Sequence, residues 1–342
     1  MVKTQSLITP RPRSAKRGGH HSSLSLKAPA KINWFLHVYS LRKDGYHDIK
    51  SLIQKISLYD VLTFEPSKDL TVITDARIQK EENLVYKAGV LLRNEYRINM
   101  GAEIHLYKNI PVAAGLGGGS SDAALTLIGL NKLWSLELST RELCDIAEQL
   151  GSDVPFFLYG PLALVEGRGE KITPIKAAKK YNLLLVKPHI SISTKWAYGQ
   201  LKHRTQSAEH RTQNTDNPPS PPFSKGGKGG FISEPQTPNS KLSKLTKIND
   251  KVDNIKFFIN AVRQAEINKN INITNDLESV TAQNFPVIAD IKESLDREGA
   301  IFSIMSGSGP TVFGVFTSVE DAENASKAFK EHWTAVVQTL ID

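Results

Sequence analysis

The 342-residue sequence has a single cysteine, Cys144, so no intrachain disulfide can form. This composition excludes a secreted disulfide scaffold and fits a protein of the reducing cytosol. Cys144 lies in a helical pattern, where we expect it to be a small, buried apolar residue. The sequence also lacks a run of about 20 apolar residues, the length that a membrane-spanning helix needs. We therefore expect no membrane partner.

Acidic residues are absent from the first 43 positions, which carry nine lysines and arginines. Because the whole chain has a net charge of +8, the remainder has a net charge of −1. The basic charge thus belongs to one end of the chain and does not indicate a nucleic-acid-binding surface. Residues 1–26 are predicted to be a disordered basic extension. We expect a bacterial-type cytoplasmic protein, with plastid import by this extension as the alternative.

One glycine-rich segment leads directly into a predicted helix. Residues 111–123 read PVAAGLGGGSSDA, and a strongly apolar helical pattern follows at once. Glycine permits positive φ and close approach to a ligand, and a helix start offers unpaired N–H groups and a positive dipole end. Together these features predict a cradle for an anion such as phosphate. A structural turn or a flexible surface loop is the alternative.

The segment fits neither of two common nucleotide-binding patterns. A Walker A loop needs Gly-Lys-Ser/Thr at a fixed spacing, and no such triplet follows. In the dinucleotide fingerprint the third glycine would fall at Ser120, and no acidic strand end lies about 20 residues on.

Alternating and helical patterns place the glycine segment in a chain of mixed helices and short strands, which predicts an α+β fold. The expected strands cover residues 31–40, 51–64, 70–74, 102–107, 162–175, 182–186, 301–305 and 311–316. The expected helices run from Asn83 to Tyr96, from the glycines to Trp134, from the capping box Ser139–Glu142 to Gly151, over 253–268, over 278–297 with a break at Pro286, and from Ser318 onward.

Residues 203–253 are polar and rich in proline and glycine at their centre. Such a segment cannot bury enough apolar surface to offset the entropy of ordering it, so it is predicted to be a disordered insertion. A proline-rich docking site is the alternative.

Two charged residues suggest chemistry. Asp153 follows a predicted helix end, where a carboxylate can orient a hydroxyl and take its proton during in-line phosphoryl transfer. Lys31 stands at the start of an otherwise apolar strand and could face the transferred phosphate or that acid. The alternatives are that Asp153 is an ordinary turn residue and that Lys31 is a solvated lysine at a strand edge. The pair makes sense only if the fold brings the two side chains together.

Two further segments are candidates. Residues 306–310, Ser-Gly-Ser-Gly-Pro, lie between two predicted strands and form either a hairpin loop or a second nest of N–H groups facing phosphate. Asp44-Gly45 predicts a hairpin turn, after which Tyr46 and His47 could hold a flat heterocycle. A half-buried pair on a strand is the alternative for these two side chains.

Taken together, these segments resemble the GHMP kinase superfamily, which includes galactokinase and homoserine, mevalonate and phosphomevalonate kinases. Its three motifs are matched by residues 29–33, 115–121 and 306–310. Residues 44–47, 151–156 and 166–170 narrow the resemblance to the branch of the non-mevalonate isoprenoid pathway. The resemblance covers residues 27–202 and 254–335.

The resemblance implies a two-domain fold with the active site in the cleft between the domains. Residues 27–175 would form the N-terminal ATP-binding domain, which is of the ribosomal protein S5 domain 2-like type. Residues 176–342 would form a ferredoxin-like C-terminal domain that carries the insertion at 203–253.

The resemblance also implies an activity, in which ATP phosphorylates the C2 hydroxyl of a cytidyl-diphospho-methylerythritol substrate. Asp153 would be the catalytic base and Lys31 its electrostatic partner. Asn33 would position the substrate, Tyr46 and His47 would hold the cytosine, and Tyr198 would supply the opposing stack. Mg²⁺ is expected with ATP, without a protein ligand that can be named. The ATP phosphates would be wrapped by Pro111, Val112, Ala113, Ala114, Gly115, Leu116, Gly117, Gly118, Gly119, Ser120 and Ser121.

Three rival interpretations stay open at this point. A sister kinase acting on homoserine or a mevalonate derivative is the nearest, although residues 44–47 argue against it. A nucleic-acid-binding protein is opposed by the charge distribution, and a catalytically silent relative by the presence of both Lys31 and Asp153. We expect small-molecule partners only, and a monomer or weak homodimer.

Overall fold

The computed structural model describes residues 23–201, 255–264, 266–267 and 273–341. The predicted insertion at 203–253 lies outside the described residues, as do positions 1–22 of the predicted extension. The first strand begins at Leu24, inside that expected extension. Within the described part, helices and sheets are mixed along the chain, which confirms the α+β class.

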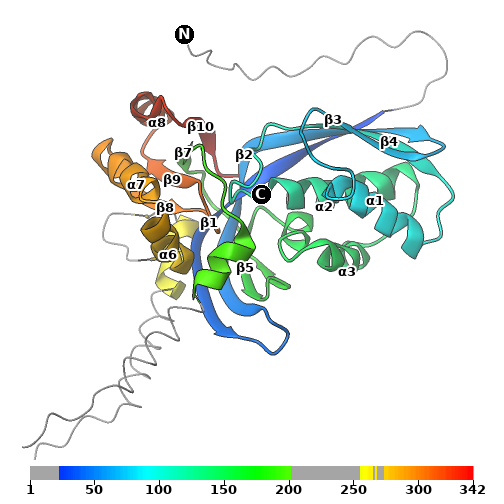
Figure 1. Ribbon diagram of the computed structural model, residues 1–342, viewed down its shortest axis with the longest axis horizontal. Coiled ribbons are helices and arrows are strands. Elements are labelled where there is room, and N and C mark those ends of the chain that lie inside the picture. Colours follow the sequence, from blue (N-terminus) through cyan, green and yellow to red (C-terminus); the bar gives the residue numbers. More distant parts are fainter. Residues whose placement is uncertain (1–22, 202–254, 265, 268–272, 342) are drawn as a thin grey trace, which may run out of the picture.

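A six-stranded sheet forms one half of the molecule. Its strands have the order β3-β4-β2-β5-β6, and β1 pairs antiparallel with β2. Helices α1–α3 pack beneath it (Figure 1). The bounds are β1 Leu24–Leu41, β2 His47–Ser67, β3 Leu70–Thr74, α1 Leu84–Glu95, β4 Gly101–Tyr107, α2 Gly118–Leu133, α3 Thr140–Leu150, β5 Leu162–Gly167 and β6 Lys171–Pro174. A short 3-10 helix, η1 Pro155–Leu158, follows α3.

A four-stranded antiparallel sheet of order β10-β7-β9-β8 forms the other half. Helices α6–α8 flank it (Figure 1). The bounds are β7 Asn182–Lys187, α6 Asp276–Asn284, α7 Val287–Arg297, β8 Phe302–Met305, β9 Val312–Phe316, α8 Val319–Ser326 and β10 Trp333–Gln338, with a short 3-10 helix η2 at Lys327–Phe329. Residues 194–201 and 255–264 are also helical.

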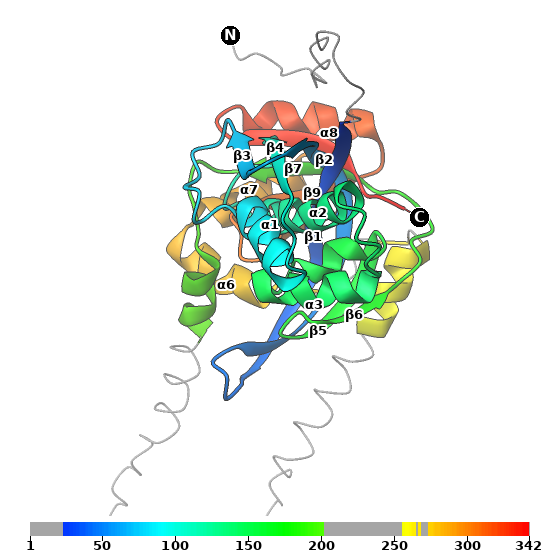
Figure 2. The same ribbon diagram turned by 90° about the vertical axis from the view of Figure 1, so that its right-hand side faces the viewer.

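The prediction of short strands is wrong for β1 and β2, which have 18 and 21 residues. Their pairing shifts register between Pro29 and Ala30, between Asn33 and Phe35, and again near the hairpin end. Such bulges bend a strand and increase its twist. The two-stranded ribbon formed by β1 and β2 can therefore belong to the first sheet at one end and reach the second sheet further along. Its hairpin end projects from the body of the molecule (Figures 1 and 2).

Trp34 of β1 joins the ribbon to the core of the second half. Its ring lies 5.0 Å from that of Tyr181 and 5.7 Å from that of Phe313, both in edge-on geometry. Its indole N–H donates to Gln54 of β2 at 2.7 Å. Aromatic pairs of this kind add to the burial energy, so one hydrophobic core includes residues from both sheets.

Local signals predicted most element ends correctly. Asn83 caps α1, Ser139 and Glu142 form the capping box of α3, and Ser318 caps α8. Residues 162–175 form a hairpin of two strands, β5 and β6, that turns at residues 168–170. The last strand, β10, was not predicted from the sequence.

Cys144 is buried in α3, as expected, and burial raises the pKa of its thiol. Within the described ranges, no helix is long and apolar enough to cross a membrane.

Gly129 tests the packing of α2 on the first sheet. A Cβ atom at this position would overlap the ring of Phe64. We expect Gly129→Ala to lower the free energy of unfolding by about 1–3 kcal/mol, measured by urea denaturation, because overpacking outweighs the gain in helix propensity.

Gly199→Ala is the matched control for this change. Gly199 is also helical, and a Cβ there would meet nothing within 4 Å. This variant should be as stable as the parent or more stable. If Gly129→Ala were equally harmless, the packing of Phe64 against α2 would be wrong.

Candidate active site

The segment 111–119, the first glycine loop, leads from β4 into α2. Gly117 is the N-cap of α2, with φ of 68°, and no side chain caps the helix. Gly115 also has positive φ, at 75°. The N-terminus of α2 therefore presents backbone N–H groups that no side-chain cap satisfies, together with the positive end of the helix dipole. This arrangement is the predicted anion cradle.

Residues 306–310, the second glycine loop, connect β8 to β9 and pack directly against the first glycine loop. Ser306 Oγ donates to the carbonyl of Gly115 at 3.0 Å, and the Thr311 N–H donates to that of Ala114 at 3.4 Å. A Cβ atom on Gly115 would overlap the Ser306 carbonyl oxygen. Only glycine allows this contact, so the two loops form one continuous backbone surface.

The buried side chain of Lys31 lies beneath both loops. Its Nζ donates to Asn33 Oδ1 at 2.6 Å and lies 3.6 Å from Asp153 Oδ2. Its backbone N–H donates to Leu116 in the first loop at 2.9 Å, and a Cβ on Gly117 would come within 2.9 Å of its Cγ. Lys31 is interior to β1, not at the strand start as expected. The structure brings Lys31 and Asp153 together at the first glycine loop.

Asp153 lies in the turn between α3 and η1, and its side chain is 40% exposed. Lys55, the cross-strand partner of Lys31, holds the segment that follows Asp153. Its Nζ donates to the carbonyls of Phe157 at 3.0 Å and Tyr159 at 2.6 Å, and burial lowers its pKa to about 8. Sequence analysis missed Lys55, because its role depends on strand register.

Lys31, Asp153 and residues of both glycine loops line a cavity of about 520 Å³. Its walls include both predicted charged residues, the first glycine loop, part of the second loop and the N-terminus of α1. A cavity of this size is typical of small-molecule sites. Members of the predicted set on its walls are Lys31, Asn33, Pro111, Val112, Ala113, Ala114, Gly115, Gly117, Gly118, Gly119, Ser120, Asp153 and Tyr198.

The residues predicted to hold a heterocycle are only partly brought together. The His47 and Tyr198 rings lie 5.9 Å apart at 32°, and His47 Nδ1 lies 3.0 Å from the Tyr39 carbonyl oxygen. Burial, aided by the charge of Asp153, raises the pKa of the Tyr198 hydroxyl. Tyr46 instead lines a neighbouring hollow of about 210 Å³ and is 54% exposed, with the Arg168 guanidinium 5.5 Å from its ring centre.

Asn33 is occupied by protein contacts. Its Oδ1 accepts from Lys31, and its Nδ2 donates to Ser51 Oγ at 2.8 Å. The structure therefore shows Asn33 orienting the lysine side chain.

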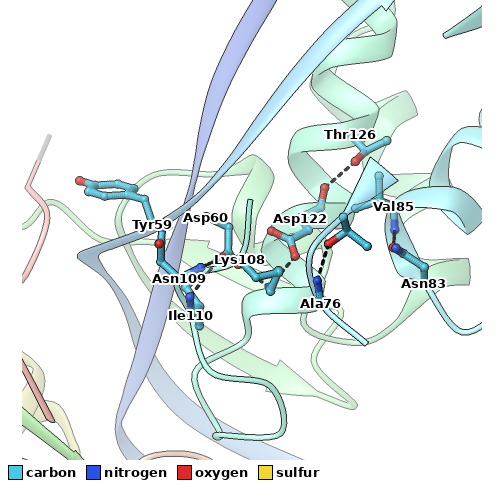
Figure 3. A network of polar contacts seen from close by, with 11 residues as sticks. Tyr59, Asp60, Ala76, Asn83, Val85, Lys108, Asn109, Ile110, Asp122 and Thr126 are labelled. Atoms are coloured by element: carbon cyan, nitrogen blue, oxygen red, sulfur yellow. Dashed lines mark hydrogen bonds and ion pairs between the residues drawn. The ribbon is translucent and has the colours of Figure 1, made fainter. Parts of the chain in front are cut away.

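A second ionic cluster, also missed from the sequence, joins β2, the residue after β4, and α2 (Figure 3). Lys108, at the end of β4, donates to both Asp60 of β2 and Asp122 of α2. Asp60 Oδ1 also accepts the backbone N–H groups of Asn109 at 2.6 Å and Ile110 at 2.8 Å. The cluster thus ties both ends of the loop to the central strand.

Burial dominates the electrostatics of this cluster. It raises the pKa of Asp122 to about 7, although the nearby ammonium of Lys108 opposes the shift. Burial alone would lower the pKa of Lys108, but the two carboxylates outweigh it and raise that pKa. The signal in the sequence was Asp122 itself, an acid at a position that the helical pattern buries.

Comparison with family models matches two parts of the chain. Residues 83–161 match the N-terminal domain of GHMP kinases, and residues 258–335 match their C-terminal domain. The matched ranges contain the first and the second glycine loop respectively.

Full-length relatives agree with these matches. The chain is 43% identical to 4-diphosphocytidyl-2-C-methyl-D-erythritol kinase of Thermodesulfovibrio yellowstonii, covering 93% of this chain and 99% of that protein. It is 38% identical to the enzyme of the same name from Geobacter metallireducens, covering 90% and 94%.

Solved structures confirm the predicted fold. A crystal structure of 4-(cytidine 5'-diphospho)-2C-methyl-D-erythritol kinase aligns with a TM-score of 0.68 at 27% identity, covering 92% of this chain and 99% of that one. Homoserine kinase from Cytophaga hutchinsonii aligns with a TM-score of 0.66 at 18% identity, covering 96% and 98%. The second likeness supports the fold alone.

Lys108 tests the buried cluster. Lys108→Met keeps the aliphatic stem but leaves the carboxylates of Asp60 and Asp122 without their cation. We expect a loss of about 3–5 kcal/mol in the free energy of unfolding at pH 8. The loss should be smaller at pH 6, because protonation of Asp122 removes one uncompensated charge. Urea unfolding at the two pH values measures both effects.

Lys132→Met, at an exposed position of the same helix α2, is the control. It should change the stability by no more than about 0.5 kcal/mol at either pH. A Lys108→Met penalty that is equally large at pH 6 and pH 8 would contradict the assignment of Asp122 as the group that titrates.

Proposed function

This chain belongs to the 4-diphosphocytidyl-2-C-methyl-D-erythritol kinase family of the GHMP kinases, and we propose how its residues carry out the reaction of that family. The chain is an ATP-dependent kinase. It phosphorylates the C2 hydroxyl of 4-diphosphocytidyl-2-C-methyl-D-erythritol, giving the 2-phosphate and ADP. The reaction is a step of the non-mevalonate route to isopentenyl diphosphate.

The convergence of Lys31 and Asp153 at the first glycine loop carries the mechanistic proposal. Asp153, partly exposed on the cavity wall, accepts the proton of the C2 hydroxyl. The hydroxyl oxygen then bonds to the γ-phosphorus of ATP while the bond between that phosphorus and the β–γ bridging oxygen breaks. Lys31 pairs with this carboxylate and offers positive charge to the phosphoryl group in transfer.

The backbone of both glycine loops binds the polyphosphate. The N-terminus of α2 supplies N–H donors and dipole charge, and the second loop closes the same wall of the cavity. Mg²⁺ enters with ATP and neutralises phosphate charge. Among the described residues, no group of three or more His, Cys, Asp or Glu side chains is arranged to hold a metal ion.

The cytosine binds beside the contacting rings of His47 and Tyr198, where Tyr198 lines the cavity. Rings of this size provide stacking surface for a pyrimidine, and the imidazole can hydrogen-bond the edge of the base. Tyr46 covers the base from the adjacent hollow. Asn33 acts on the substrate indirectly, by fixing the Lys31 side chain.

A sister kinase acting on homoserine or mevalonate is less well supported. The matches to those enzymes share the fold at 18% identity or less. The relatives named for the cytidyl substrate are 34–43% identical over about nine tenths of this chain.

The buried Cys144, which forms no disulfide, supports a reducing compartment as the site of action.

Asp153→Asn tests the catalytic base. The amide keeps the size of the side chain but cannot accept the proton, so kcat should fall by about 10²–10⁴-fold. The affinity for ATP should stay within about twofold, because Asp153 does not bind the phosphates. ADP release with the cytidyl substrate, and ATP titration by calorimetry, measure the two quantities.

Asp145→Asn, on the exposed face of α3, is the matched control and should keep the parental turnover. Unchanged turnover in Asp153→Asn would exclude Asp153 as the base. ADP release with homoserine or mevalonate that exceeds the rate with the cytidyl substrate would overturn the substrate assignment.

Tyr46→Ala tests the cytosine site. Loss of one stacking surface should raise KM for the cytidyl substrate by about 5- to 100-fold, with kcat nearly unchanged. Tyr39→Ala removes a similarly exposed tyrosine from the same hairpin and should leave KM unchanged. Equal KM values for the two variants would remove Tyr46 from the substrate site.

A further inference from the structure

The cluster of Asp60, Lys108 and Asp122 has one carboxylate more than it has cations. Asp60 is fully buried, Asp122 is 2% exposed, and both share the ammonium of Lys108. With all three groups ionised, the cluster has a net charge of −1 inside the protein. Such a charge is costly to bury, because the surroundings solvate it poorly.

The two carboxylates are not equivalent. Asp60 accepts two backbone N–H groups in addition to Lys108, so both of its oxygens have donors. Asp122 Oδ2 accepts from Lys108 at 2.7 Å, but its buried Oδ1 has no hydrogen-bond partner among the residues that the structure describes. Donated hydrogen bonds stabilise the ionised form of a carboxyl group, and Asp60 accepts more of them than Asp122. Asp122 is therefore the acid of the pair that gains a proton first.

Asp122 is also the acid placed next to the ligand. It follows Ser121 in α2 and is among the residues that line the same cavity as Gly118, Gly119 and Ser120. A phosphate bound by the N-terminus of α2 would share this space with the Asp122 carboxylate. Like charges so close together disfavour one another's ionised forms.

We propose that Asp122 takes up a proton when ATP binds at the first glycine loop, so that nucleotide binding is linked to pH through this residue. This inference rests on the proposed function, which places ATP there. Protonation removes the excess negative charge of the cluster. It also removes negative charge from the buried Oδ1, which has no donor among the described residues to stabilise it.

The surrounding charges favour uptake at Asp122. From β2 and the end of β4, Asp60 and Lys108 face its carboxyl group, and burial already brings its pKa to about 7. Arg77, Glu82, Lys31 and Asp153 line the same cavity further from this carboxyl group, as neither an ion pair nor a hydrogen bond joins them to it. A modest additional shift from bound phosphate is therefore enough to change protonation near neutral pH.

The direction of the effect follows from linkage. If bound phosphate raises the pKa of Asp122, protonation of Asp122 must strengthen nucleotide binding by the same factor. Affinity should therefore increase as pH falls from 8 to 6. Each unit by which bound phosphate raises the pKa of Asp122 strengthens nucleotide binding at pH 6 by up to about tenfold.

Calorimetry with the β,γ-imido analogue of ATP tests this inference. Titrations at pH 7.5 in buffers of different ionisation enthalpy give the number of protons taken up per nucleotide. The parent protein should take up about half a proton more than Asp122→Asn, which keeps the contact with Lys108 but cannot titrate. Protonation of the nucleotide itself cancels in this difference. Asp145→Asn, an exposed acid on α3, should behave like the parent.

Each alternative outcome has a distinct meaning. Binding with equal proton uptake in the parent and Asp122→Asn overturns this inference and leaves the kinase assignment intact. Mg²⁺-dependent proton release would also overturn it, because it would show the carboxylate acting as a metal ligand. If the parent binds no nucleotide, the proposed function itself fails.

A second measurement detects the proton in the parent protein directly. The infrared difference spectrum of the parent protein, recorded with and without the analogue at pH 7.5, should show a new carbonyl band of a protonated carboxylic acid. Loss of that band in Asp122→Asn assigns it, and its absence from the parent spectrum overturns the inference.

Discussion

The close approach of three backbone segments around the Lys31 side chain is the constraint on which the site depends. β1 supplies the lysine, the first glycine loop passes over its aliphatic stem at Gly117, and the second loop reaches its ammonium at Gly307. A Cβ on Gly307 would lie 3.3 Å from Lys31 Nζ and 3.2 Å from Asn33 Oδ1. Glycine at these positions therefore does two things at once. It permits the left-handed backbone, and it leaves room for a buried cation directly under the surface that the two glycine loops form.

The molecule uses two lysines beside one loop in opposite ways. Lys31 pairs with Asp153, whose side chain remains 40% exposed, so the pair is open to a substrate and its charges can act on reacting atoms. Lys108 is held between two buried carboxylates and fixes the ends of the first glycine loop to β2. The Lys31–Asp153 pair therefore lines the cavity, whereas the Asp60–Lys108–Asp122 cluster fixes the shape of the first glycine loop. The second cluster has an excess negative charge, and its Asp122 is among the residues that line the cavity.

Sequence analysis predicted the features that depend on neighbouring residues. The glycine loops, the caps at Asn83, Ser139 and Ser318, and the Asp44-Gly45 turn are set by local backbone chemistry, and the structure has all of them. It also raised Lys31 and Asp153 as a pair from their residue types, but only the family resemblance implied that the fold brings them together. The long ribbon, β10, Lys55 and the Asp60–Lys108–Asp122 cluster were missed. Each depends on cross-strand register or on contacts between distant segments, which alternation and propensity do not encode.

The ribbon of β1 and β2 explains how the positions of side chains can be fixed in a site that lies between two sheets. Along β1, successive side chains point to opposite faces, so Ala30, Ile32 and Trp34 enter the shared core while Lys31 and Asn33 face the cavity. The Trp34 ring is enclosed by aromatic residues of the second half, and the backbone N–H of Asn33 donates to Ser306 Oγ in the second glycine loop at 3.3 Å. Five consecutive residues thus anchor the core and present the cation. Any relative movement of the two sheets must either distort this packed strand or carry Lys31 with it, so the core that stabilises the fold also holds the distance between the cation and the phosphate cradle.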